Sequence, residues 1–139
     1  MKHKVLIVED EPFLRMKTVD LVEAAGFEAF EAGNVSEAIV ILEATPGIRI
    51  LFTDIDMPGS MDGLMLAAAV RDRWPPIQII VVSGKQKPSA RDMPDHSIFF
   101  PKPYDTKKVT DQLQKWRHRN SAHGTCASTT KFICRPILT

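Results

Sequence analysis

The sequence predicts an α/β fold in which helices cover both faces of a doubly wound, five-stranded parallel sheet. Short apolar, β-branched runs alternate with helical patterns five times within the first 120 residues, which is typical of parallel βα units. The 139 residues are enough for one domain with a buried core. An apolar content of 44% and a charged content of 25% are those of a globular protein, which argues against intrinsic disorder.

The first two units are the clearest. Lys4–Val8 is a short apolar run typical of a buried strand. Pro12 follows where the first helical turn tolerates proline, and apolar residues recur at helical spacing until Gly26 ends that helix. The second unit has a strand over Phe27–Ala32 and a helix that begins at Asn34, a favoured N-cap residue with a glutamate three positions later.

The other three units follow the same pattern, although the fourth lacks a long helix. Pro88 and Pro94 limit any helix between them to a turn or two. Each connection between parallel strands is expected to be a right-handed crossover. The remaining predicted elements are, in order, a strand Ile48–Thr53, a helix Gly63–Trp74, a strand Ile77–Val82, a strand Ser97–Phe100 and a helix Tyr104–Arg119.

The net charge of +1 conceals an uneven distribution. Residues 1–105 hold 11 basic and 16 acidic side chains, whereas residues 106–139 hold 7 basic and 1 acidic. We attribute the basic end to the last helix and a solvated tail rather than to a nucleic-acid site. No apolar run approaches the length of a membrane helix, and no signal peptide is evident, so we expect a cytoplasmic protein. Cys126 and Cys134 have no partners at metal-ligand spacing.

Carboxylate, hydroxyl and lysine side chains follow four of the predicted strands. Glu9 and Asp10 come after the first strand, Asp54 after the third, Ser83 after the fourth and Lys102 after the fifth. These residues should converge, because sites in open α/β sheets form at the carboxyl ends of the strands. An acidic cluster repels phosphate unless a cation lies between, and hard oxygen ligands suit Mg²⁺. The sequence therefore predicts a site where Mg²⁺ and a lysine neutralise a phosphoryl group.

Four motifs together resemble a response-regulator receiver domain, the CheY-like phosphoacceptor module of two-component signalling. They are Glu9-Asp10, the segment Thr53–Gly63, Ser83-Gly84 and Lys102-Pro103. The resemblance covers about residues 3–118 and implies a flavodoxin-like sheet with strand order 2-1-3-4-5. We accordingly expect a receiver over residues 1–119 and a tail over residues 120–139 that is too short for an output domain.

The resemblance also implies the roles of individual residues. Asp54 would accept the phosphoryl group. Asp10 would bind Mg²⁺ directly, Glu9 would assist through water, and Asp56 would contribute its backbone carbonyl. Asp54 itself would complete this metal site.

A second set of implied roles concerns the response to phosphorylation. Ser83 would turn to hydrogen-bond the phosphoryl group, and Lys102 would pair with it. Phe99 matches an aromatic residue that changes rotamer on activation, and the Lys102-Pro103 bond matches one that the family holds cis. As a separate hypothesis, Asp56 and Lys85 could pair across the site and lengthen the phosphoryl lifetime.

The resemblance implies a signalling switch rather than an enzyme. Its expected partners are a sensor histidine kinase or a histidine phosphotransfer protein and a downstream protein target, with no direct nucleic acid and no membrane; homodimerisation is left open.

Two alternatives stay open at this point. Asp54-Ile55-Asp56 also matches the nucleophile pair of haloacid-dehalogenase phosphatases, which use Mg²⁺, and the chain could instead be a pseudo-receiver adaptor that works without phosphorylation.

Overall fold

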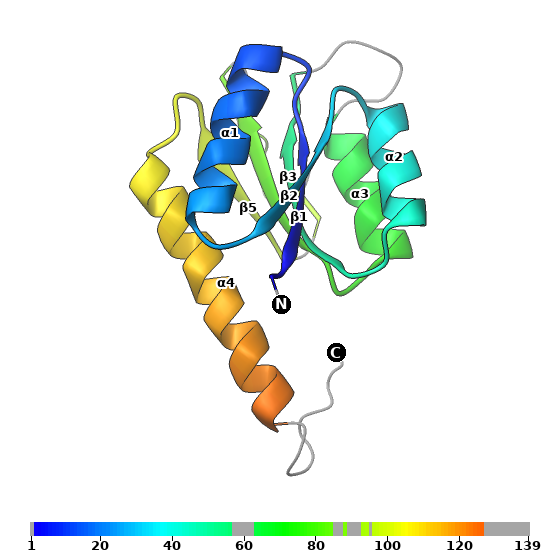
Figure 1. Cartoon of the computed structure of the whole chain (residues 1–139). Coiled ribbons are helices and arrows are strands. Elements are labelled where there is room, and N and C mark those ends of the chain that lie inside the picture. Colours follow the sequence, from blue (N-terminus) through cyan, green and yellow to red (C-terminus); the bar gives the residue numbers. More distant parts are fainter. Residues whose placement is uncertain (1, 57–62, 85–87, 89–92, 95, 127–139) are drawn as a thin grey trace.

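The expected fold is confirmed by a computed structural model, which describes residues 2–56, 63–84, 88, 93–94 and 96–126, with side chains up to Arg117 in the last helix. Five parallel strands form one sheet in the order β2-β1-β3-β4-β5 (Figure 1). In chain order the described elements are β1 (Lys4–Val8), α1 (Pro12–Ala24), β2 (Glu28–Ala32), α2 (Val35–Ala44), β3 (Ile48–Asp54), α3 (Gly63–Arg73), β4 (Gln78–Ser83), β5 (Ser97–Pro101) and α4 (Thr106–Cys126).

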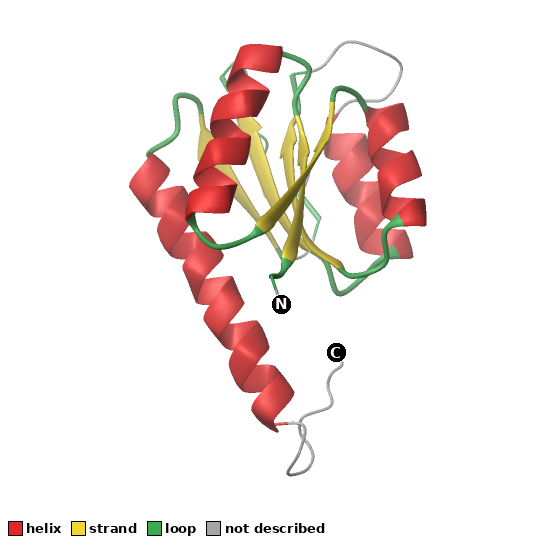
Figure 2. Cartoon of the chain, in the orientation of Figure 1, coloured by secondary structure: helices red, strands yellow, loops and turns green. Residues whose placement is uncertain are grey.

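Helices lie on both faces of the sheet, as Figure 2 shows. On one face α1 packs beside α4, and the buried side chains of Val22, Leu113 and Trp116 meet the sheet there. On the other face α2 and α3 contribute buried residues such as Leu42 and Leu66 to a second core cluster. The apolar residues of β1 and β4 are almost wholly inaccessible because each strand is covered from both sides.

Helix starts follow the expected local chemistry. The side chain of Asn34 accepts a hydrogen bond from the Glu37 amide at 2.9 Å, which confirms it as the N-cap of α2. The last helix begins at Thr106, two residues later than expected, because the Asp105 side chain accepts hydrogen bonds from the next helical amides. An aspartate followed by helix-forming residues was the available signal.

The last helix is also longer than predicted. It continues to Cys126 rather than ending at Arg119, so the expected tail is partly helical. No proline interrupts that stretch, since the next one is Pro136, and Gly124 is accommodated within the helix. The short helix expected between Pro88 and Pro94 and the loop over residues 57–62 lie outside the described residues.

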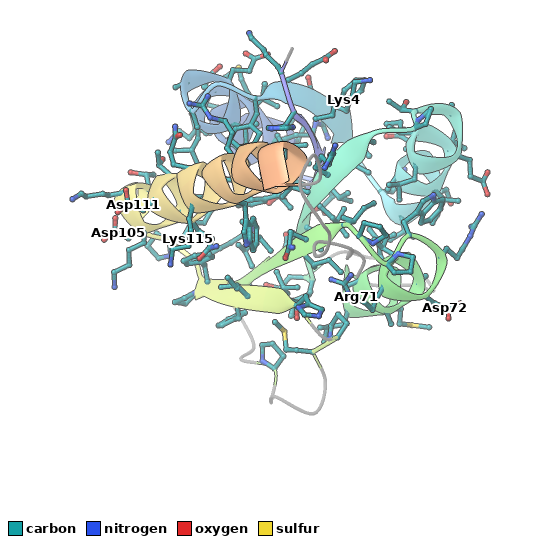
Figure 3. The ribbon with its side chains drawn as sticks, turned by 90° about the horizontal axis from the view of Figure 1, so that it is seen from below. Lys4, Arg71, Asp72, Asp105, Asp111 and Lys115 are labelled. Atoms are coloured by element: carbon teal, nitrogen blue, oxygen red, sulfur yellow. The ribbon has the colours of Figure 1, made fainter. Side chains whose placement is uncertain are left out.

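Charged side chains occupy the outer surfaces of both helical layers. Figure 3 shows Asp105, Asp111 and Lys115 on the α4 side of the molecule, and Arg71 and Asp72 on the α3 side. Among the described helices, none is both long and apolar enough to cross a bilayer.

Candidate functional site

The carboxyl ends of four strands bring the predicted side chains together. Thr53 lies beside Val8 in the sheet, so that Asp54 and Glu9 follow neighbouring strand positions. Asp54 in turn pairs with Val82, one residue before Ser83. Parallel pairing thus places residues that are up to 93 positions apart in the chain at one edge of the sheet.

Lys102 is the centre of the cluster. Its Nζ donates to Glu9 Oε1 and to Asp54 Oδ2, both at 2.9 Å. The backbone amide of Lys102 donates to the Ser83 carbonyl at 2.9 Å, which holds the residue at the end of β4. The Lys102-Pro103 peptide bond is cis, as the resemblance implied.

Burial and charge shift the pKa values of this cluster. Burial raises the pKa of Glu9, and the neighbouring Asp54 charge adds to the rise, although contacts with Lys102 and the Glu11 amide oppose it. Burial lowers the pKa of Lys102, but the two carboxylates outweigh burial and raise it overall. Both directions follow from one imbalance, because a single ammonium faces two carboxylates in a partly desolvated space.

The acidic residues also form a group that could hold a cation. Glu9, Asp10 and Asp54 each place one carboxylate oxygen so that the three lie within 4.8 Å of one another. Asp54 is 3% exposed and Glu9 is 6% exposed, whereas Asp10 faces solvent. A hard divalent cation such as Mg²⁺ suits an all-carboxylate set with one side open to water. It would also relieve the excess negative charge around Lys102.

The side chain of Asp56 makes contacts that the sequence did not reveal. Its carboxylate oxygens accept the Ser83 hydroxyl at 2.9 and 2.7 Å, and one of them accepts the Gly84 amide at 3.0 Å. The Asp56 amide donates to Asp54 Oδ1 at 2.9 Å. Ser83 therefore lies at the site as expected, but its hydroxyl is bonded to Asp56. Lys85, the other half of the pairing hypothesis, lies outside the described residues.

Gly63 is a positioning residue that sequence reasoning missed. A Cβ at this position would lie 2.1 Å from the Asp54 carbonyl oxygen and 2.8 Å from the Ile55 Cα. Only glycine lets the start of α3 approach the end of β3 so closely. The available signal was a glycine at a helix start, directly after the loop that follows the acceptor.

An apolar groove of about 410 Å³ lies beside the cluster, between α1 and the β5–α4 connection. Leu14, Leu21 and Phe52 line it, and Lys102 and Glu9 form its polar end. The hydroxyls of Thr18 and Tyr104 are 2.8 Å apart across it, a contact between residues 86 positions apart. The neighbouring surface of α1 exposes two large apolar side chains, Phe13 at 57% and Met16 at 53%.

Phe99 lies on β5, half-buried against the core cluster beneath α2 and α3. It is therefore outside the hydrogen-bonded cluster, although its strand leads directly to Lys102.

Comparisons with known proteins point to one family. A family model described as the response regulator receiver domain matches residues 5–114. The chain is 35% identical over 115 residues to the sensor kinase CckA of Brucella abortus, covering 80% of this chain. It is 27% identical over 115 residues to the response regulator receiver protein CpdR of the same organism, covering 81% of this chain and 94% of CpdR. Several of the curated relatives, among them CckA, are much longer proteins, and the chain spans only 12% to 24% of their length.

One solved structure shares the fold and carries ligands. The response regulator TrrA of Thermotoga maritima, in complex with Mg²⁺ and BeF, superposes with a TM-score of 0.70 at 24% identity. The match covers 83% of this chain and 98% of TrrA.

Proposed function

The chain belongs to the response regulator receiver family, and from this membership we propose that Asp54 accepts a phosphoryl group from a sensor histidine kinase or a histidine phosphotransfer protein. Receivers are phosphorylation-dependent switches of two-component signalling rather than enzymes. The observation that carries the assignment of Asp54 is the Lys102 ammonium, which bonds this buried carboxylate at the one edge of the sheet where Glu9 and Asp10 also meet.

The reaction needs a nucleophile and a means of neutralising charge. A carboxylate oxygen of Asp54 attacks phosphorus, a P–O bond forms, the P–N bond to the donor histidine breaks, and the imidazole leaves with the electron pair. The product is an acyl phosphate. Lys102 is within reach of the developing charge because it already bonds Asp54 Oδ2, and the Asp56 amide orients the other oxygen. Such transfer depends on positioning and electrostatics more than on acid–base groups.

The donor set fits Mg²⁺, and the proposed ligands are Asp10, Asp54, Glu9 through water, and the backbone carbonyl of Asp56. When bound, the ion would neutralise phosphoryl oxygens and offset the Asp54 charge that, after burial, raises the pKa of Glu9. The TrrA complex with Mg²⁺ and BeF shows that a receiver of this fold takes up both groups.

Helix α1 offers the protein that donates the phosphoryl group an exposed apolar surface. Phe13 and Met16 on α1 are more than half exposed, and Leu14 and Leu21 of the same helix line the groove that ends at Lys102. We propose that the phosphodonor binds there. We propose that a downstream protein binds at the surface around Ser83 and Phe99, whose side chains are expected to move on phosphorylation. A cytoplasmic location and a protein target, rather than nucleic acid, complete the proposal.

The two alternatives are less well supported. Membership of the receiver family disfavours a haloacid-dehalogenase-like phosphatase built on Asp54 and Asp56. A pseudo-receiver adaptor would have no need of a buried carboxylate bonded to a lysine beside two further acidic residues.

The test is phosphorylation of the purified chain by acetyl phosphate with Mg²⁺, followed by intact-mass spectrometry. We expect a gain of one phosphoryl group that is absent in Asp54→Asn and absent when Mg²⁺ is chelated. Asp111→Asn, an exposed carboxylate on α4, is the matched control and should be modified normally (Figure 3). Modification that persists in Asp54→Asn would contradict the assignment of the acceptor.

A further inference from the structure

We propose that the Asp56 carboxylate competes with the phosphoryl group for the same hydrogen-bond donors and thereby opposes the phosphorylated state. The inference rests on the proposed function, because it assumes that Asp54 is the acceptor. It assigns to Asp56 a positioning role that is separate from its backbone carbonyl. The carboxylate acts through Ser83 and Gly84 rather than through the reacting atoms.

The Asp56 carboxylate accepts hydrogen bonds from two donors at the end of β4. The Ser83 hydroxyl lies 2.9 and 2.7 Å from the two oxygens of Asp56, and the Gly84 amide lies 3.0 Å from one of them. An ionised carboxylate can only accept, so the hydroxyl must donate. Ser83 is 2% exposed, which means that its hydroxyl cannot turn to bulk water instead.

The same donors lie next to the acceptor. Asp54 pairs with Val82 across the sheet, so Ser83 and Gly84 follow immediately at the strand end where a phosphoryl group on Asp54 would sit. The Asp56 amide bonds Asp54 Oδ1, which keeps the competing carboxylate within two residues of the acceptor. A phosphoryl dianion offers three strong acceptor oxygens at this point.

The two sets of bonds exclude each other. A serine hydroxyl has one proton, so it donates its strong hydrogen bond either to Asp56 or to the phosphoryl group. Formation of the acyl phosphate must therefore break the bonds to Asp56 and leave that carboxylate beside a second anion. The hydrogen bonds to Asp56 therefore stabilise the unphosphorylated state relative to the phosphorylated state.

The test measures the affinity of the 139-residue chain for beryllofluoride, a phosphoryl mimic, at saturating Mg²⁺, from the ¹⁵N-resolved Gly84 amide signal. Asp56→Ala should bind about tenfold more tightly, since it loses the competing hydrogen bonds and one negative charge. Asp56→Asn should fall between that variant and the wild type, because an amide keeps one acceptor oxygen. Asp111→Ala, which removes an exposed carboxylate on α4, should not change the affinity.

A double-mutant cycle with Ser83→Ala separates competition from simple charge repulsion. In the Ser83→Ala background, Asp56→Ala should improve binding only about twofold, because the hydroxyl is gone and only the Gly84 amide remains as a shared donor. Equal improvement in both backgrounds would overturn the proposal and leave only a charge effect. Without ligand, the Gly84 amide signal of Asp56→Ala should move away from its wild-type position because the amide loses its bond to Asp56, and an unmoved signal would count equally against the proposal. A wild-type chain that does not bind beryllofluoride would instead refute the proposed function itself.

Discussion

Replacing Lys102 by methionine tests whether the ammonium stabilises the acidic cluster as well as serving chemistry. Methionine keeps the apolar stem but removes both 2.9 Å contacts. The side chains of Asp54 and Glu9 are 3% and 8% exposed, so neither carboxylate can recover much hydration in the variant. Removing one partner of a buried pair typically costs about 3 to 5 kcal/mol. Because Lys102 retains 20% of its side-chain exposure, we expect a smaller loss of unfolding free energy, about 2 to 3 kcal/mol.

The assay is urea unfolding at pH 7 without divalent cations, followed by the fluorescence of Trp74 and Trp116. Adding Asp54→Asn to Lys102→Met should recover about 1 to 2 kcal/mol, since it removes the repulsion between two uncompensated carboxylates. Lys115→Met, on the exposed side of α4, is the matched control and should change stability by less than about 0.5 kcal/mol (Figure 3). A Lys102→Met variant as stable as the wild type, or no recovery with Asp54→Asn, would refute the reasoning.

Three further predictions concern single contacts. Because the pKa of Glu9 is raised in the folded state, its carboxyl group stabilises the fold below the ordinary pKa of 4.5 and loses that contribution as pH rises through the folded-state pKa. Glu9→Gln should therefore flatten the decrease of the urea midpoint above pH 4.5. A pH profile identical to that of the wild type would contradict this. Gly63→Ala should cost about 1 to 3 kcal/mol in thermal or urea unfolding because its methyl group collides with the carbonyl of the acceptor residue, whereas Gly84→Ala, whose methyl group meets its nearest neighbour at 3.5 Å, should cost clearly less. Tyr104→Phe should cost about 1 kcal/mol through the lost Thr18 hydrogen bond, and Tyr104→Phe and Thr18→Val should be non-additive in a double-mutant cycle.

Much of the fold was predictable because its causes are local. The signals act within a few residues: the strand and helix patterns, the Asn34 cap and the glycine after α1. From such signals, both ends of every strand were predicted to within one residue. The α4 boundaries were wrong at both ends. The start depends on a side-chain cap at Asp105, and the helix continues through Gly124 in a stretch without proline.

The sequence by itself determined which side chains reach the site. Once the strands are parallel, residues that follow them must meet at one edge, so Glu9, Asp54, Ser83 and Lys102 were predictable without distances. Only the tertiary structure decided how they pair in the unphosphorylated chain: Lys102 bridges two carboxylates, and Asp56 holds the Ser83 hydroxyl. The physical reason is the precision that each kind of information provides. Periodicity places a residue to within a strand end, whereas a hydrogen bond depends on a few tenths of an ångström, which the packing of the helices and the approach of α3 to β3 set.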